Sequence, residues 1–169
     1  RYVEIRHDGL RWVEGYGISG KPNQGIREQS EQAFQKMEAM LEAEGLSFSH
    51  VKRQWNYISN IVGETDGRQH YQIFNDVRAR YYKTADFEAG YPAATGIGTR
   101  GIEAMDAGGV MLEFIALDTM GRRDIIDKGI INTWQVSAHS YAKAFLGEGA
   151  AQKKETPKFE RARVIIIPK

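Results

Sequence analysis

The sequence contains no cysteine, which excludes disulfide bonds, thiolate metal sites and a cysteine nucleophile. It also lacks any apolar run that approaches the roughly 20 residues of a membrane-spanning helix. An excess of charge is missing as well, because 23 basic and 22 acidic side chains leave a net charge of +1. We therefore predict neither nucleic acid nor a membrane as a partner. The lack of cysteine is compatible with a reducing cytoplasm, which is the location that we predict.

Histidine and serine patterns of known catalytic sites are missing too. The four histidines (His7, His50, His70 and His139) show no metal-ligand spacing, and no serine lies in a G-x-S-x-G turn. We expect surface positions for the histidines, and neither a metal nor a cofactor for the protein.

What is present suits one domain with an appendage: 169 residues, of which 41% are apolar. The chain starts at Arg1 rather than Met, and it ends in the apolar, β-branched segment RARVIIIPK. We therefore expect a trimmed chain or one piece of a longer polypeptide.

Hydrophobic periodicity predicts a mixed order of strands and helices. The segment 26–44 carries one apolar stripe of helical period, and Gly45 stands where a helix C′ residue belongs. Gly15, Gly17 and Gly20 are expected to interrupt the second strand. The predicted elements, in the order ββαβαββ, are strands at 2–6 and 11–16, a helix at 26–44, a strand at 51–58, a helix at 69–82, and strands from Ala94 and from Val110.

The segment after Asp118 is less regular. NTWQVSAHSYAKAF suits either an extended segment or a short helix, and GEGAAQKKETPK has the composition of a loop. ARVIII is predicted to form a final strand.

Gly96, Gly98 and Gly101 spell G-x-G-x-x-G, the pattern of a dinucleotide-binding turn. That turn needs a strand before it and a helix of about a dozen residues after it. Only eight residues separate Gly101 from the strand at Val110, which is too few for a crossover helix. We expect instead that the glycines leave one strand face bare, either to pack closely or to line a cleft.

Two features of the strands carry possible chemistry. Glu113 interrupts the apolar segment VMLEFIAL, so it is either a buried candidate for acid–base catalysis or a solvent-facing residue of an alternating strand. Arg53, Trp55 and Tyr57 share one face of a predicted strand. That face either receives a planar carboxylate ligand, stacks a nucleobase, or is a core stripe with an arginine at its rim.

Four segments in order resemble the Rid family (YjgF, endoribonuclease L-PSP-like) over about residues 11–117: EQAFQKMEAMLEAEGLSFSHVKRQWNYIS, YQIFNDVRARYY, YPAATGIG and VMLEFIAL. The resemblance implies an α+β chorismate-mutase-like fold, a mixed β-sheet with two helices packed on one face. It also implies a trimer with ligand clefts between subunits.

Deaminases of that family hold the substrate carboxylate with the arginine of a P-A-R-T segment. By resemblance, Ala94 stands in place of this arginine and Thr95 matches the threonine. Glu113 matches the glutamate of the last strand, and Asn75 matches an asparagine of the second helix. Because Ala94 offers no guanidinium, we do not expect ordinary imine deamination. Arg53 and Arg100 are the candidates to replace it.

PAATGIG followed by NTWQVSAHSYAKAF and PKFERA also resembles the first of two Rid-like halves in chorismatase-type proteins. His139 departs from that pattern, in which a tyrosine is usual. We expect a Rid-like domain at 1–118 and a C-terminal extension at 119–169 that leads toward a second such domain.

The sequence thus favours a divergent Rid-like protein that binds a small carboxylate or carbonyl metabolite. The alternative is a non-catalytic half of a tandem protein with a role in assembly. If the chain is an enzyme, a hydrolase or lyase is expected, with Glu113 as the catalytic residue. The predicted binding residues are Arg53, Trp55, Asn75, Ala94, Thr95, Gly96 and Arg100, and the predicted partner is a second copy or a tandem Rid-like domain.

Overall fold

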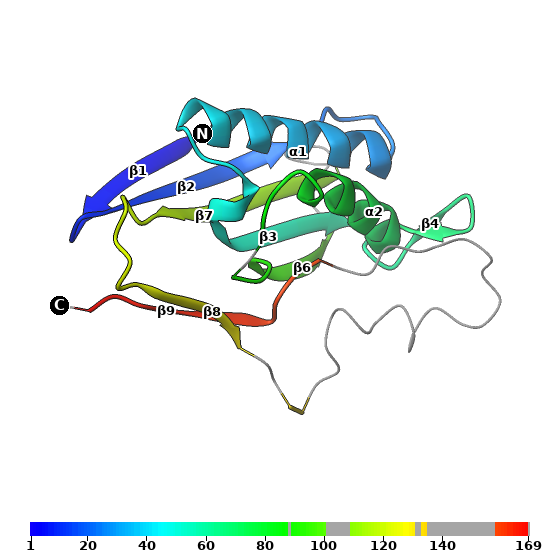
Figure 1. Cartoon of the computed structure of the whole chain (residues 1–169). Helices are drawn as coiled ribbons and strands as arrows, with labels where there is room; N and C mark the ends of the chain where they lie inside the picture. Colours follow the sequence, from blue (N-terminus) through cyan, green and yellow to red (C-terminus); the bar gives the residue numbers. More distant parts are fainter. Residues whose placement is uncertain (88, 101–108, 131–132, 135–157, 169) are drawn as a thin grey trace.

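The computed structural model describes residues 1–87, 89–100, 109–130, 133–134 and 158–168. Within them the chain forms strands, two α-helices and one short 3₁₀ helix (Figure 1). In chain order the elements are β1 (Tyr2–His7), β2 (Leu10–Ser19), α1 (Ile26–Ala43), η1 (Phe48–His50), β3 (Val51–Ser59), β4 (Glu64–Thr65), β5 (Arg68–Gln69), α2 (His70–Tyr82), β6 (Ala93–Thr99), β7 (Val110–Asp118), β8 (Ile126–Ile130) and β9 (Ala162–Ile166).

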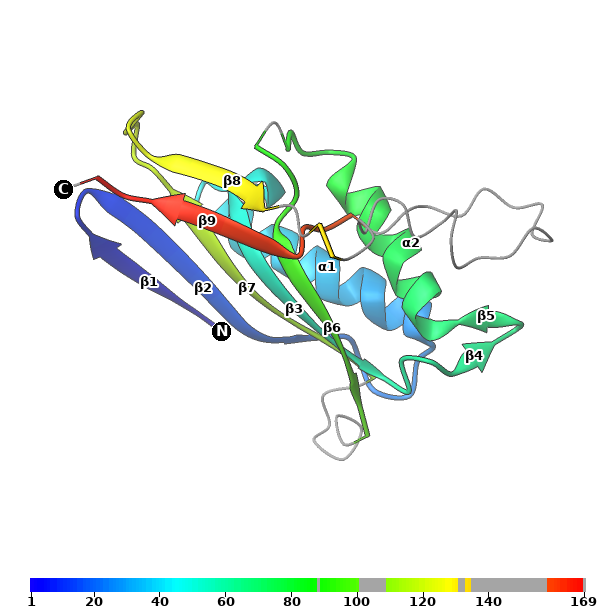
Figure 2. The same cartoon turned by 90° about the horizontal axis from the view of Figure 1, so that it is seen from below.

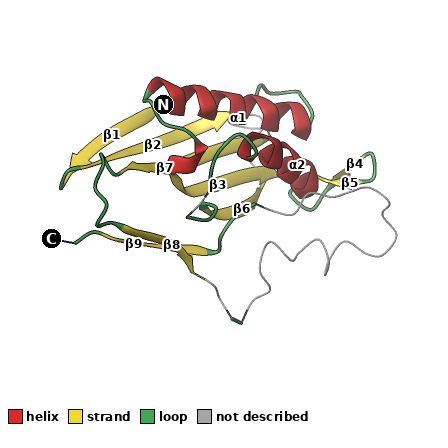
Figure 3. Ribbon diagram, viewed as in Figure 1, coloured by secondary structure: helices red, strands yellow, loops and turns green. Residues whose placement is uncertain are grey.

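Five strands form the main sheet in the order β1-β2-β7-β3-β6. Only β3 and β6 run parallel, and α2 connects them, whereas the other neighbours are antiparallel. Both helices cover the same face of this sheet (Figure 3). The predicted α+β class, with a mixed sheet and two helices on one face, is therefore confirmed.

Helix α1 follows the predicted apolar stripe and packs that stripe into the core. Ala33, Phe34, Met37 and Leu41 are buried, and Gly45 takes a φ of 68° just after the helix. A positive φ causes little strain in glycine, so the chain can leave the helix at this position. Among the described helices, none is long and apolar enough to cross a membrane.

The prediction that Gly15 and Gly17 break the second strand is wrong, although the strand does end just before Gly20. β2 continues to Ser19, and its pairing with β7 shifts register between Gly15 and Ile18. Gly17 has a φ of 60°, as an extra residue in a β-bulge often does. A side chain at Gly15 would begin 2.2 Å from the Phe114 ring, so this glycine admits the ring into the core.

β8 and β9 form a separate two-stranded ribbon, which lies on the side of the main sheet away from the helices (Figures 1 and 2). The final strand was predicted, but β8 was not. Asp127 of β8 anchors the ribbon. Its carboxylate forms ion pairs with the ammonium of Lys52 in β3, at 2.9 Å, and with the guanidinium of Arg163 in β9, at 2.8 Å. Apart from residues 133 and 134, the NTWQVSAHSYAKAF segment lies outside the described residues, as does GEGAAQKKETP.

The G-x-G pair lies inside β6 and not in a turn between a strand and a helix. The bare side of β6 packs closely: a Cβ on Gly98 would lie 2.6 Å from Ile61 Cγ2, and one on Gly96 would lie 3.1 Å from the Tyr71 ring. This rules out the dinucleotide turn and supports close packing at both glycines, while Gly98 also lines a hollow at this end of β6.

We expect Gly98→Ala to lower the free energy of unfolding by about 1 to 3 kcal/mol, because overpacking forces Ile61 to move. Gly96→Ala is the matched control and is expected to cost less, since its contact is looser. Urea denaturation of both variants measures the difference. A Gly98→Ala variant as stable as the wild type would contradict this packing.

Candidate functional site

The face of the main sheet away from the helices, called the open face below, gathers four of the predicted site residues. Strand pairing sets Trp55 of β3 directly between Thr95 of β6 and Glu113 of β7. Arg53 lies two residues before Trp55, on the same face. The buried residues of β3 and β7 alternate with these positions and face the helices. Of the two interpretations of Glu113, the structure therefore supports the alternating strand.

Arg53 is held in place by its two neighbours. Its Nη2 donates a hydrogen bond to Thr95 Oγ1 at 2.6 Å, and its guanidinium carbon lies 4.8 Å from the centre of the Trp55 ring. Partial burial lowers the pKa of Arg53 from its ordinary value. An arginine nonetheless stays protonated in proteins, so Arg53 offers a fixed positive charge on the open face.

Glu113 accepts a hydrogen bond from the Tyr57 hydroxyl, with 3.1 Å between the two oxygens. Burial, followed by this contact with Glu113, raises the pKa of Tyr57. The hydroxyl therefore remains a donor at neutral pH and fixes the direction of the carboxylate. Across the open face, a cation, a hydroxyl, an indole ring and an oriented carboxylate thus lie side by side.

The surroundings of this cluster on the open face are largely apolar. Its apolar side chains include Trp12, Tyr16, Ile97, Met111 and Ile115, none of them buried, and the same register also places Glu14 and the buried Leu117 on this face. Tyr16 is 42% exposed, and its pKa is raised by a hydrogen bond to Glu14 and, more weakly, by the charge of Glu113. Among the described residues, no group of three or more histidines or acids could hold a metal ion.

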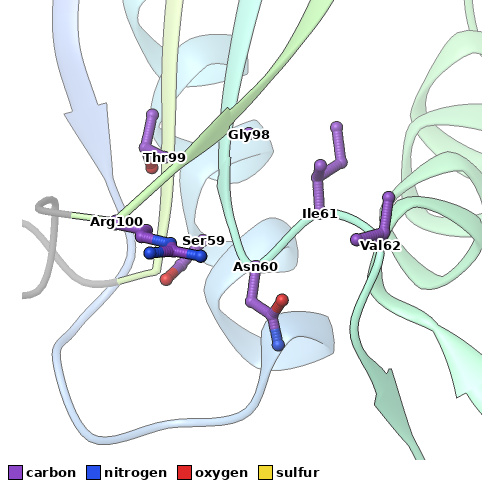
Figure 4. A pocket seen from close by; sticks show the side chains of 7 residues that line it. All are labelled: Ser59, Asn60, Ile61, Val62, Gly98, Thr99 and Arg100. Carbon is purple, nitrogen blue, oxygen red and sulfur yellow. The ribbon is translucent and has the colours of Figure 1, made fainter.

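A hollow of about 550 Å³ lies at the carboxyl ends of the parallel strands β3 and β6 (Figure 4). Ser59, Asn60, Ile61, Val62, Gly98, Thr99 and Arg100 line it. Arg100, a predicted binding residue, therefore lies at this hollow, at the other end of β6 from Ala93. The predicted site residues do not form one cluster.

The other predicted residues lie on the helix side of the sheet. Ala94 is buried, and its partner in the β3 register is Gln54. Gly96 packs near Tyr71, and Asn75 on α2 is 2% exposed. None of these three residues presents a side chain to the open face.

Sequence reasoning assigned no role to a buried polar row under β3. Tyr82 donates to Gln54 Oε1 at 2.5 Å, Gln54 Nε2 donates to Asn56 Oδ1 at 2.5 Å, and Asn56 Nδ2 donates to the Thr95 carbonyl at 3.2 Å. The row ends directly behind Thr95 and fixes the β6 backbone at the open-face cluster. The sequence carries a signal for this row: Gln54 and Asn56 alternate with Arg53 and Trp55, so they lie on the opposite face of β3.

Comparisons with known proteins agree with this architecture. The sequence profile described as "Chorismatase FkbO/Hyg5-like, N-terminal" matches residues 3–116. A "3-hydroxybenzoate synthase" from Streptomyces hygroscopicus is 31% identical over 164 residues, which span 95% of this chain and 41% of that protein. The chain thus spans less than half the length of this curated relative.

Solved structures show the same fold. A chorismatase crystal structure superposes with a TM-score of 0.62 at 24% identity, over 96% of this chain and 43% of that one. The Rid-family protein YyfA from Yersinia pestis superposes with a TM-score of 0.50 at 19% identity, over 67% of this chain and 83% of that one. The main sheet and its two helices are therefore the chorismate-mutase-like fold of Rid proteins and chorismatases. From the profile match over 3–116, the chain belongs to the family of chorismatase FkbO/Hyg5-like N-terminal domains.

Proposed function

We propose that the open-face cluster binds a small carboxylate or carbonyl metabolite. The observation that carries this proposal is the set of contacts that fixes Arg53 beside Thr95 and Trp55, next to the oriented carboxylate of Glu113. In this assignment Arg53 supplies the guanidinium that the chain lacks at position 94, but from the opposite face of the sheet, because Ala94 faces the helices.

Each residue of the cluster has a distinct role in the proposal. The Arg53 guanidinium and the Thr95 hydroxyl hold the ligand carboxylate, since an arginine fork matches a carboxylate geometrically. The Trp55 ring supports the planar part of the ligand. Glu113 supplies a proton acceptor, and its bond to Tyr57 keeps it aimed at the ligand.

A second Rid-like unit completes the cleft in this proposal. A sheet face with several partly exposed apolar side chains is a surface suited to association. The second unit is either another copy of the chain, in a trimer, or a tandem Rid-like domain. Residues 1–118 form the Rid-like domain in this proposal, residues 119–169 its extension, and the assembly works in the cytoplasm.

The relatives suggest which ligands to try first. One similar structure is a chorismatase, so chorismate is the first candidate, followed by small keto and imino acids. If the assembly is catalytic, hydrolase or lyase chemistry fits the cluster, with Glu113 as acid–base residue.

Calorimetric titration of these ligands tests the assignment of Arg53. We expect Arg53→Gln to weaken binding about 10- to 100-fold, which is the effect of losing a hydrogen bond to a charged group. Arg123→Gln, at an exposed position, is the matched control and is expected to bind like the wild type. Equal affinity for both variants would refute the assignment and leave the assembly role as the better account.

A further inference from the structure

A second arginine, Arg78 of α2, lies on the helix side of the sheet. It is 1% exposed and is among the largest fully buried side chains of the described residues. No carboxylate in the described part of the chain forms an ion pair with its guanidinium. A buried charge without a counterion is rare in proteins, because desolvation is costly unless the charge is paired.

The contacts of Arg78 compensate its charge only in part. Nη2 donates to Asn75 Oδ1 at 2.6 Å, but Nε is buried without a hydrogen-bond partner. The guanidinium carbon lies 5.6 Å from the centre of the Phe74 ring and 5.3 Å from that of Phe159. Aromatic faces attract a cation, but they offer no acceptor to Nε.

Phe159 contacts Arg78 from a part of the chain far from α2, the helix that carries Phe74 and Asn75. It precedes β9 and packs against Ala94, where the small side chain leaves room for the ring. The neighbouring Glu160 fixes the segment to the edge of the sheet: its N–H donates to the Pro92 carbonyl at 3.0 Å, and its carbonyl accepts the Ala94 N–H at 3.1 Å. The Phe159 side chain can therefore rotate away while the backbone remains paired.

We propose that Arg78 is a second carboxylate-binding residue, which Phe159 covers in this structure and a small monocarboxylate reaches when the ring moves aside. The unpartnered Nε and the adjacent Nη2 form one edge of the guanidinium. That edge can donate one hydrogen bond to each oxygen of a carboxylate, which would supply the negative charge that no carboxylate of the described residues provides. A planar ligand of the size of a phenyl ring fits the space that Phe159 now fills.

This site is separate from the open-face cluster, because Arg78 and Arg53 lie on opposite faces of the main sheet. The inference therefore does not rest on the proposed function, and either can fail without the other.

Benzoate is the probe, and the arginine Nε–H signals in two-dimensional nitrogen–proton NMR spectra are the readout. The Arg78 signal is identified as the one that disappears in Arg78→Lys. We expect benzoate to shift this signal in a saturable way in Phe159→Ala, with at least a tenfold lower Kd than in the wild type. Arg53→Gln, combined with Phe159→Ala, is the matched control and is expected to leave this binding unchanged.

Several outcomes would overturn the proposal. Calorimetric titration compares the Arg53→Gln/Phe159→Ala variant with and without Arg78→Lys, and equal benzoate affinity of the two would show that the Arg78 guanidinium is not the receptor. Loss of binding in the Arg53→Gln combination would place benzoate on the open face. If Phe159→Ala does not fold, Phe159→Leu is tested instead. Its Kd for benzoate is expected to lie between that of the wild type and that of a fully uncovered site. An affinity no higher than that of the wild type would contradict the covering role of Phe159.

Discussion

Phe34→Ala is expected to lower the free energy of unfolding by about 3 to 5 kcal/mol, as large-to-small changes at fully buried aromatic positions do. Phe34 has no exposed surface and lies at the centre of the apolar core between α1, α2 and the sheet. Its ring centre is 5.4 Å from that of Tyr81 and 5.6 Å from that of Phe74. The substitution therefore removes contacts to both helix α2 and the rest of the core.

Chemical denaturation of Phe34→Ala and Phe34→Leu measures this effect. Leucine retains most of the volume, so Phe34→Leu is expected to cost clearly less than Phe34→Ala. The loss in Phe34→Ala is a large part of the roughly 5 to 15 kcal/mol that stabilises a typical domain. A loss below about 1 kcal/mol would mean that Phe34 does not occupy the core as described.

The second large effect is expected at Gln54, in the buried polar row. Gln54→Leu leaves the Tyr82 hydroxyl without its acceptor and Asn56 Oδ1 without its donor. Both groups are buried, and each unsatisfied buried group costs about 1 to 3 kcal/mol, so we expect a total loss of about 2 to 6 kcal/mol. Burial also raises the pKa of Tyr82, so the hydroxyl cannot escape this cost by ionising at neutral pH.

A double-mutant cycle with Tyr82→Phe separates the polar row from simple packing. Tyr82→Phe removes only the hydroxyl, so it leaves Gln54 with one unmet acceptor and is expected to cost less than Gln54→Leu. The double variant is expected to be more stable than the sum of the single losses predicts, because both ends of one hydrogen bond are then gone. Strict additivity would show that the Tyr82–Gln54 hydrogen bond contributes nothing to stability.

Local patterns in the sequence predicted much of the fold. The 3.6-residue stripe of α1 and the alternation in β3 and β7 depend only on which side chains are apolar, and the structure confirms both. Gly15 and Gly17 were misjudged, because whether a glycine ends a strand or forms a bulge depends on the partner strand. β8 was missed because the strand that it pairs with among the described residues, β9, lies more than thirty residues away in the chain.

The candidate site was predictable only as far as local periodicity reaches. Arg53 and Trp55 share one strand, so alternation alone placed them together. Their proximity to Thr95 and Glu113 follows from strand order and register, which periodicity does not reveal; the resemblance to Rid proteins supplied those residues instead. Arg78 lies in the predicted helix at 69–82, but its contact with Phe159 and the lack of a carboxylate partner among the described residues are visible only in three dimensions.

The most direct test of the proposed function is a crystal structure of the protein soaked with chorismate and, separately, with a small keto acid. We expect a ligand carboxylate within hydrogen-bond distance of Arg53 and Thr95, a planar group over Trp55, and Glu113 facing the reactive part of the ligand. A ligand bound instead in the hollow between Ser59 and Arg100, with the open-face cluster empty at saturating concentration, would contradict the account.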